Sequence, residues 1–184
     1  MYKIARKLKK KNITEYLIYM WQVEDLIRAN QFNIDKIKAS LIDPMPSLSE
    51  EELKAELQWF TELIDMMYTE GVKESGHLQI NQNVIIQLND LHQELISCTK
   101  YPLYNAAFYK ALPFIAELRA KNNEEKKCDI EMCFDALYGV ILLRLQKKEL
   151  TEQTNKAVDL IANFVAVLAN YYAKDKAGEL KLTD

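Results

Sequence analysis

The sequence predicts an all-α fold, a single helical domain over residues 1–184 built from about six or seven helices. The 184 residues include only four glycines and four prolines, a composition that favours long helices over a turn-rich β architecture. Apolar residues recur at helical spacing along most of the chain, and no window alternates with the period of two typical of strands. A domain of this length can bury roughly 70% of its unfolded surface.

The most apolar helix is expected near the C-terminal end. Between residues 157 and 173 the only polar side chains are Asp159, Asn163 and Asn170. On a helix these three fall within about 40° of one another, so the rest of the circumference is apolar. Such a helix needs protein on nearly every side. We therefore expect it to be either the central rod of the bundle or a seam between copies of the chain.

The first two helices are defined by their capping residues. Asn12 or Thr14 can cap a helix that runs to about residue 30. Asn33 then opens a short helix over residues 34–42, which the prolines that follow bring to an end. The main apolar stripe of the first helix consists of Tyr16, Met20, Val23 and Ile27.

Longer helices follow in the middle of the chain. Ser49 and Glu52 have the spacing of a capping box and begin a long helix. The helix after it carries an apolar stripe of Ile80, Val84, Leu88, Leu91 and Leu95. Pro102 suits the first turn of the next helix. Pro113 predicts a kink or a restart within that helix, because an interior proline costs roughly 3 kcal/mol.

The last third of the chain predicts two more helices. The polar run over residues 121–127 is expected to be a loop, and Asp129 can cap the helix after it. Within that helix Gly139 costs roughly 1 kcal/mol, which indicates the close approach of another helix. Thr151 caps the last helix, and residues 176–184 are expected to form a frayed tail.

Charge is distributed unevenly along the chain. The net charge is −3, yet residues 1–11 carry six lysine or arginine side chains and no acidic one, so the remainder carries −9. This basic N-terminal arm could bind anionic lipid or nucleic-acid phosphates. The acidic body opposes nucleic acid and no segment can span a membrane, so neither partner is favoured. Alternatively the arm is a solvated helix, or one docked on the acidic residues Glu50, Glu51, Glu52, Glu56 and Glu62.

The cysteines and histidines do not form a metal site. Cys98, Cys128 and Cys133 are an odd set in a chain without a signal peptide, which predicts a reducing, cytoplasmic compartment. Cys128 and Cys133 do not share a helix face, and zinc sites need four ligands. Glu74 and His77 form one Glu-x-x-His pair, whereas a di-iron bundle needs two. We expect no metal and no cofactor.

A second stripe on the first helix is the best candidate for an interaction surface. It consists of Ile18, Trp21, Asp25 and Arg28, which recur away from the main apolar stripe. An exposed tryptophan flanked by charges is a group that anchors partners. In the alternative, the helix is sandwiched between two layers, Trp21 is buried, and Glu24 pairs with Arg28.

A candidate pocket involves the helices on either side of Pro102. His92 lies at the edge of its apolar stripe, where it could act as an acid or base near neutral pH. Tyr104, Asn105 and Tyr109 could line a pocket for a polar-tipped ligand. The alternatives are a boundary histidine with one hydrogen bond and tyrosines that close the end of a bundle.

Three segments are distinctive: NITEYLIYMWQVEDLIRAN, GHLQINQNVIIQLNDLH and CFDALYGVILLRLQKKEL. With them the chain resembles an uncharacterised family of bacterial domains of unknown function, over nearly its whole length. The resemblance implies an all-helical, cytoplasmic protein. It transfers no catalytic or binding residue, because the family has none established.

The sequence leaves the biochemical function unknown, and the absence of a recognisable catalytic motif disfavours an enzyme. The first interpretation is a helical interaction or assembly protein that self-associates as a homo-oligomer. It rests on the apolar circumference of the last helix and on the second stripe around Trp21. The second is a small-ligand-binding protein, or an enzyme of unrecognised type, that uses the tyrosine region or His92. The third is binding to anionic surfaces through residues 1–11.

Overall fold

The computed structural model describes residues 1–45, 48–122 and 126–182. Within these residues it has eight α-helices, one π-helical turn and no strand, which confirms the all-α prediction. There are more helices than the six or seven expected, because the basic arm forms a helix of its own. The chain divides into two compact units, residues 1–83 and residues 84–184. That the whole chain is one domain stays a prediction.

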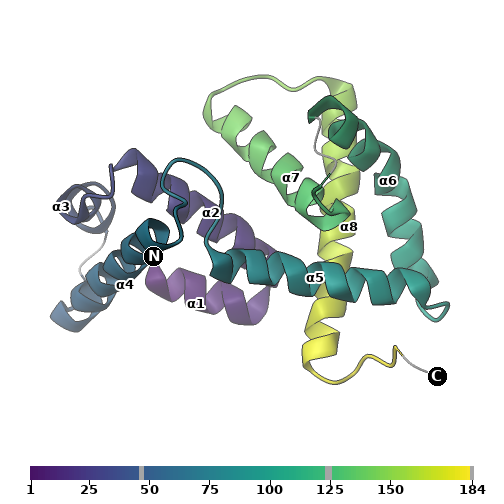
Figure 1. Ribbon diagram of the computed structural model, residues 1–184, viewed down its shortest axis with the longest axis horizontal. Coiled ribbons are helices and arrows are strands. Elements are labelled where there is room, and N and C mark those ends of the chain that lie inside the picture. The colour runs from purple at the N-terminus through teal and green to yellow at the C-terminus, as the bar shows by residue number, and fades with distance from the viewer. Residues whose placement is uncertain (46–47, 123–125, 183–184) are drawn as a thin grey trace. The chain divides into compact units, whose positions relative to one another are not determined.

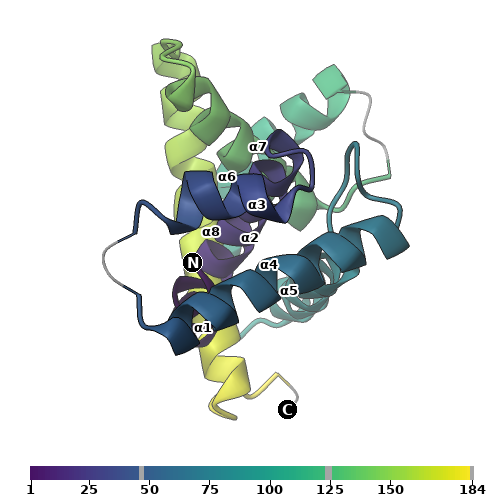
Figure 2. The same cartoon turned by 90° about the vertical axis from the view of Figure 1, so that its left-hand side faces the viewer.

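The first unit contains five helical segments and the beginning of a sixth. These are α1 (Tyr2–Lys11), α2 (Ile13–Ala29), α3 (Ile34–Ile37), the π-helical turn η1 (Lys38–Ile42), α4 (Glu50–Thr69) and the start of α5 (Gln79–Ser97). Within the unit α2 contacts both α1 and α4 (Figure 1), and α3 lies beside α4 (Figure 2). The fully buried side chains of its core include Leu17, Trp21, Val23, Ile27, Ile37, Phe60 and Met67.

The caps of this unit form as the sequence predicts. Asn12 accepts hydrogen bonds from two backbone amides in the first turn of α2, and Asn33 does the same for α3. Ser49 and Glu52 make the reciprocal pair of a capping box at the start of α4. Each bond satisfies a backbone donor that the helix itself leaves without a partner.

The basic arm is docked on the acidic helix. The Glu56 carboxylate, which is buried, accepts the backbone N–H of Tyr2 at 2.9 and 3.0 Å and the amino group of Met1 at 2.6 Å. Lys3 forms an ion pair with Glu52. The start of the basic arm is therefore docked on this acidic stretch, as one alternative expected, while α1 as a whole packs chiefly against α2. Carboxylates at the start of α1 also complement the positive end of its helix dipole.

The second unit contains the rest of α5 together with α6 (Pro102–Asn122), α7 (Asp129–Leu145) and α8 (Glu152–Lys176). Within this unit α8 contacts α6 and α7, and those two helices also contact each other (Figure 1). Its core is rich in aromatic side chains, among them Tyr104, Phe108, Phe134 and Phe164.

α8 has one exposed polar face and one buried apolar face within the second unit. Asp159, Asn163 and Asn170 are exposed, as the narrow polar face predicts. The opposite face is buried against the neighbouring helices and consists of Val158, Ile161, Phe164, Val165 and Leu168. That α8 also forms a seam between copies stays a prediction.

Two expectations about helix ends need correction. Of the kink or restart expected at Pro113, the restart does not occur, because α6 continues through Pro113 to Asn122. A kink at Pro113 stays a prediction. Pro113 is exposed and Tyr109, four residues before it, is also exposed, so the carbonyl that loses its amide partner lies on the solvent side. At the start of α7 the capping residue is Cys128 and not Asp129: its Sγ accepts the backbone N–H of Glu131.

The two remaining segments are the expected loop and the tail. The loop predicted over residues 121–127 lies partly outside the described residues, which omit 123–125. After α8, Lys181 exchanges two backbone hydrogen bonds with the hydroxyl of Tyr101, at 3.1 and 3.2 Å. This part of the expected frayed tail is therefore held to the second unit.

Candidate functional site

The second stripe of α2 does not form an exposed surface around Trp21. That side chain is 1% exposed, and its ring stacks on His77 with centroids 3.9 Å apart and 7° between the planes. Ile18 is half-buried, and Arg28 pairs with Asp25 at 2.8 Å. The structure therefore gives the alternative in which the helix is sandwiched and Trp21 is buried, because the segment between α4 and α5 covers this side of α2.

Arg28 fastens this covering segment to α2. Its guanidinium donates hydrogen bonds to three backbone carbonyls, those of Val72, Lys73 and Gly76. Arginine suits this role because its planar fork presents several donors in a fixed geometry. Arg28 is therefore a structural residue of the first unit.

Glu24 also binds the segment between α4 and α5 to α2, from a buried position inside the unit. In the alternative with a buried Trp21 it was expected to pair with Arg28, but its side chain is fully buried and bonds to other residues. Its carboxylate accepts three hydrogen bonds: from Nδ1 of His77 at 2.6 Å, from the backbone N–H of Leu78 at 3.0 Å and from Nδ2 of Asn81 at 2.6 Å. A buried carboxylate is tolerated when several donors satisfy its oxygens. We call Glu24, His77, Leu78 and Asn81 the carboxylate latch.

The second unit buries a different ionisable group. His92 is fully buried, and its Nδ1 lies 2.6 Å from the hydroxyl of Tyr104. Burial lowers the pKa of His92 from 6.5 to about 4, an effect that the nearby Asp129 carboxylate opposes only in part. Burial also raises the pKa of Tyr104. The tyrosine therefore donates to a neutral imidazole, whose ring meets Phe108 in a T-shaped contact with centroids 4.6 Å apart.

The structure places the four residues of the predicted pocket in different environments. His92 and Tyr104 are brought together, but inside the aromatic core. Asn105 is half-buried, and Tyr109 is 61% exposed. The alternative of a histidine with one hydrogen bond describes His92, although it lies deeper than a boundary position. Neutral at physiological pH and closed off from solvent, His92 is unsuited to proton transfer with an outside molecule.

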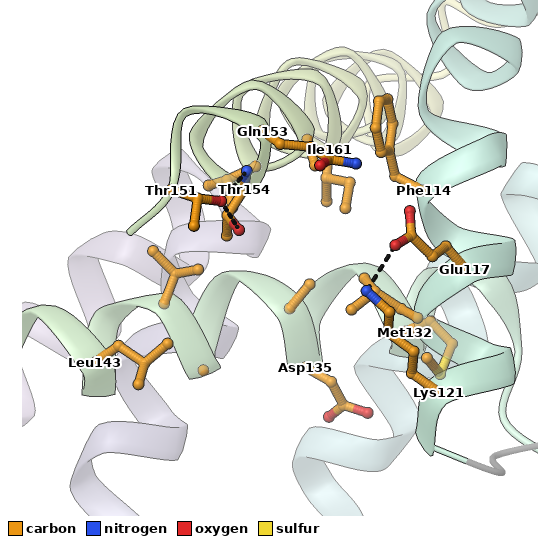
Figure 3. A pocket seen from close by; sticks show the side chains of 16 residues that line it. Phe114, Glu117, Lys121, Met132, Asp135, Leu143, Thr151, Gln153, Thr154 and Ile161 are labelled. Carbon is orange, nitrogen blue, oxygen red and sulfur yellow. Dashed lines mark hydrogen bonds and ion pairs between the residues drawn. The ribbon is translucent and has the colours of Figure 1, made fainter. Parts of the chain in front are cut away.

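A cavity lies elsewhere in the second unit, between α6, α7 and the beginning of α8. Its volume is about 460 Å³, within the usual range for small-molecule sites. Figure 3 shows the lining side chains, which come from all three helices. Most of the wall is apolar and consists of Phe114, Leu118, Met132, Ala136, Gly139, Val140, Leu143, Ala157, Val158 and Ile161.

Gly139 shapes this cavity. A Cβ atom added at Gly139 would meet no other atom within 4 Å, although the residue lies in the middle of α7. The expectation that Gly139 marks the close approach of another helix is therefore wrong. A glycine costs roughly 1 kcal/mol relative to alanine inside a helix. The glycine therefore leaves open space along the wall of the cavity and does not serve a tight helix crossing.

Polar side chains stand at the two ends of the cavity. In Figure 3, Thr151 and Thr154 lie at the end marked by Leu143, whereas Glu117 and Lys121 lie at the other end. The polar side chains are joined in pairs: Thr151 with Thr154 at 2.8 Å, Glu117 with Lys121 at 2.6 Å, and Asp135 with Lys127 at 2.9 Å. Along α7 the lining runs from Met132 to Leu143, a length of about 16 Å at 1.5 Å per residue. The cavity is therefore elongated and mostly apolar, with polar side chains at both ends and with Asp135 and Gln153 between them.

Sequence reasoning did not predict these lining residues as a site. The one local signal was Gly139, a helix-weakening residue without a turn to explain it. Its meaning depends on whether a neighbouring helix fills the space beside it, and this is settled only by the packing of α6 and α8. The other lining residues look like ordinary members of amphipathic helices.

The described part of the chain also contains cysteine, histidine and acidic side chains of the kinds that metal sites use. No group of three or more His, Cys, Asp or Glu side chains there is placed to hold a metal ion. Among those same residues, no helix has both the length and the apolar character needed to cross a bilayer. Cys98, Cys128 and Cys133 are free thiols, and burial raises the pKa of the Cys133 thiol, which disfavours the reactive thiolate.

Comparison with protein families decides what kind of chain this is. A family described as a domain of unknown function, DUF4924, matches residues 2–179. The chain belongs to the DUF4924 family. The match confirms the resemblance to an uncharacterised family over nearly the whole length. Searches of curated proteins and of solved structures give no match to this DUF4924 chain. Its function therefore has to be argued from its own geometry.

Proposed function

We propose that this protein binds a small, elongated and largely apolar molecule in the cavity between α6, α7 and α8. The observation that carries the proposal is Gly139. At this position α7 lacks a side chain although there is room for one, and the space left lies on the cavity wall. A ligand that fills this space would bury apolar surface, and each Å² buried contributes about 25 cal/mol of favourable binding free energy.

The polar ends suggest how such a ligand is oriented. The hydroxyls of Thr151 and Thr154 can donate and accept, so that end suits an uncharged hydrogen-bonding group. At the other end Glu117 already pairs with Lys121, so the rim offers both charges and no net excess. We therefore favour a neutral or zwitterionic molecule with an apolar body over a strongly charged one.

Filling the cavity from the protein side tests this function. Gly139→Leu places an apolar side chain into the open space, whereas Ala166→Leu places the same side chain on the exposed side of α8. The probe is N-phenyl-1-naphthylamine, an uncharged fluorophore, titrated by fluorescence, with circular dichroism as the check on folding. We expect binding to weaken about tenfold or more in Gly139→Leu, the effect of a clash of 1–3 kcal/mol, and to stay within about twofold in Ala166→Leu. Equal binding by a folded Gly139→Leu variant would show that the cavity is not the site.

Self-association, the first interpretation from the sequence, is supported by a separate observation. Leu142 and Leu145 are 36% and 72% exposed and lie one turn apart on α7. Exposed leucines grouped on one helix face are typical of surfaces covered by another protein. We keep a homo-oligomer as the second candidate. Native mass spectra of the protein alone and with the bound probe would give the number of subunits and the number of probe molecules per subunit.

The setting of these activities is also a proposal. Three free cysteines support a reducing compartment, which fits a cytoplasmic protein. The bacterial origin that the family resemblance implies is consistent with this setting.

A further inference from the structure

We propose that the outward face of α1 docks the protein on an anionic lipid surface. The proposal is independent of the cavity in the second unit. It starts from how α1 packs. Ala5 is buried and Leu8 half-buried, so these two residues define the side of α1 that faces its own unit.

The other side of α1 is a basic face with one apolar member. On an ideal helix five exposed residues fall within about 120° of arc. They are Lys3, Ile4, Lys7, Lys10 and Lys11. Ile4 is 49% exposed and lies at the edge of this group. We call these five residues the basic face of α1.

The acidic neighbours of α1 do not neutralise this face. Glu56 accepts the backbone N–H of Tyr2 and the amino group of Met1, and Glu52 pairs with Lys3. Within the described part of the chain, Lys7, Lys10 and Lys11 form no ion pair. Arg6 and Lys9 lie over the rings of Tyr2 and Tyr16 instead. Three lysines on one face therefore remain available for an outside anion.

The exposed isoleucine favours a bilayer over a nucleic acid. A helix lying in a membrane interface inserts apolar side chains and long lysine stems while its charges meet lipid phosphates. A nucleic acid offers no apolar layer for Ile4 and contacts a broader protein surface. Residues 1–83 contain 11 basic and 13 acidic residues, so a broader contact would meet net negative charge. The basic face of α1 thus suits a partner that touches one helix only.

Vesicle sedimentation with the full chain tests this docking. The probes are vesicles of phosphatidylglycerol with phosphatidylcholine, and vesicles of phosphatidylcholine alone. We expect binding to the anionic vesicles only, weakening as salt is raised. A variant with Lys7→Gln, Lys10→Gln and Lys11→Gln should bind about a hundredfold more weakly, at about fivefold for each lysine near an anionic surface. A matched variant with Lys110→Gln, Lys148→Gln and Lys156→Gln, all exposed in the second unit, should stay within about twofold.

Ile4→Ser separates lipid from nucleic acid. It should weaken vesicle binding about fivefold, because part of one apolar side chain no longer leaves water. The absence of binding to anionic vesicles by the unaltered chain would overturn the proposal, as would equal losses in the two lysine variants. A different result would overturn the proposal in favour of nucleic acid. In that case the chain would bind duplex DNA but not vesicles, and DNA binding would need Lys7, Lys10 and Lys11 but be unaffected by Ile4→Ser. Because Ile4→Ser and the salt series leave all the lysines in place, the test does not depend on the folding of the triple variant.

Discussion

In residues 1–83 the most deeply buried carboxylate is that of Glu24, which accepts three hydrogen bonds from the start of α5 and the residues before it. In residues 84–184 the buried imidazole of His92 has one hydrogen-bond partner and is otherwise surrounded by aromatic rings. The first unit must fix a loop against a helix, and loops expose backbone groups that need partners. The second unit packs helices whose backbone groups are already satisfied. Its core can therefore be aromatic, and it can leave a cavity.

The largest effect is expected from breaking the carboxylate latch. Glu24→Ala leaves the Leu78 amide, the Asn81 amide group and His77 without their shared acceptor, so the free energy of unfolding should fall by about 3–5 kcal/mol. Urea unfolding measures the loss, and hydrogen exchange should locate it around residues 71–83. Glu15→Ala, an exposed carboxylate on the same helix, is the control and should cost less than about 1 kcal/mol. Equal losses in the two variants would mean that Glu24 does not hold the loop.

The pH dependence of stability tests the neutral histidine. The folded pKa of His92 is lowered to about 4, whereas an unfolded histidine titrates near 6.5. Above pH 6.5 both states are neutral and the fold keeps its full stability. As the pH falls from 6.5 to 4 the unfolded state takes up a proton that the folded state refuses, so up to about 3 kcal/mol is lost.

Replacing His92 separates its contribution to the pH dependence of stability from the contributions of the other titrating groups. His92→Gln can still accept from Tyr104 but does not titrate, so its stability should fall less steeply between pH 7 and pH 4.5 than that of the unaltered chain. Urea midpoints at the two pH values give the difference. Parallel slopes in the two proteins would contradict a neutral, buried His92.

The smallest effect compares one glycine from each unit. Gly139→Ala should raise stability by about 1 kcal/mol, because alanine is the better helix former and the added Cβ meets nothing within 4 Å. Gly71→Ala should lower it by about 1 kcal/mol, because Gly71 has a φ of +72°, a left-handed conformation that L-residues disfavour. Thermal unfolding should therefore shift in opposite directions. A loss of stability in Gly139→Ala would mean that the space beside it is not open.

Local signals predicted the helices well. Asn12, Asn33, Ser49 and Thr151 all cap the helices expected of them, because capping is decided within three or four residues of the chain. The exposed polar face of α8 was equally predictable, since three polar side chains on one side of an apolar helix leave a single face for water.

The site depended on contacts between distant residues and could not be predicted in the same way. Trp21 has the spacing of an exposed stripe, and only the return of His77 to α2 buries it. Glu24 had one plausible partner four residues away in Arg28, and the structure gives both residues partners more than 40 positions along the chain. Gly139 could mark either a close helix approach or an open space, and the packing of the other helices decides which.

The loop over residues 71–78 is largely exposed, yet the hydrogen bonds from Arg28 to three of its carbonyls should protect it from proteolysis. Lys73 and Glu74 are on the surface, where a protease can reach them. Cleavage requires more than reach, because the enzyme must draw several residues of extended backbone into its active site. Arg28 and the carboxylate latch hold that backbone at both ends of the loop, so nicking there requires the loop to detach first. The rate of digestion at Lys73 would thus report how often this part of the first unit opens.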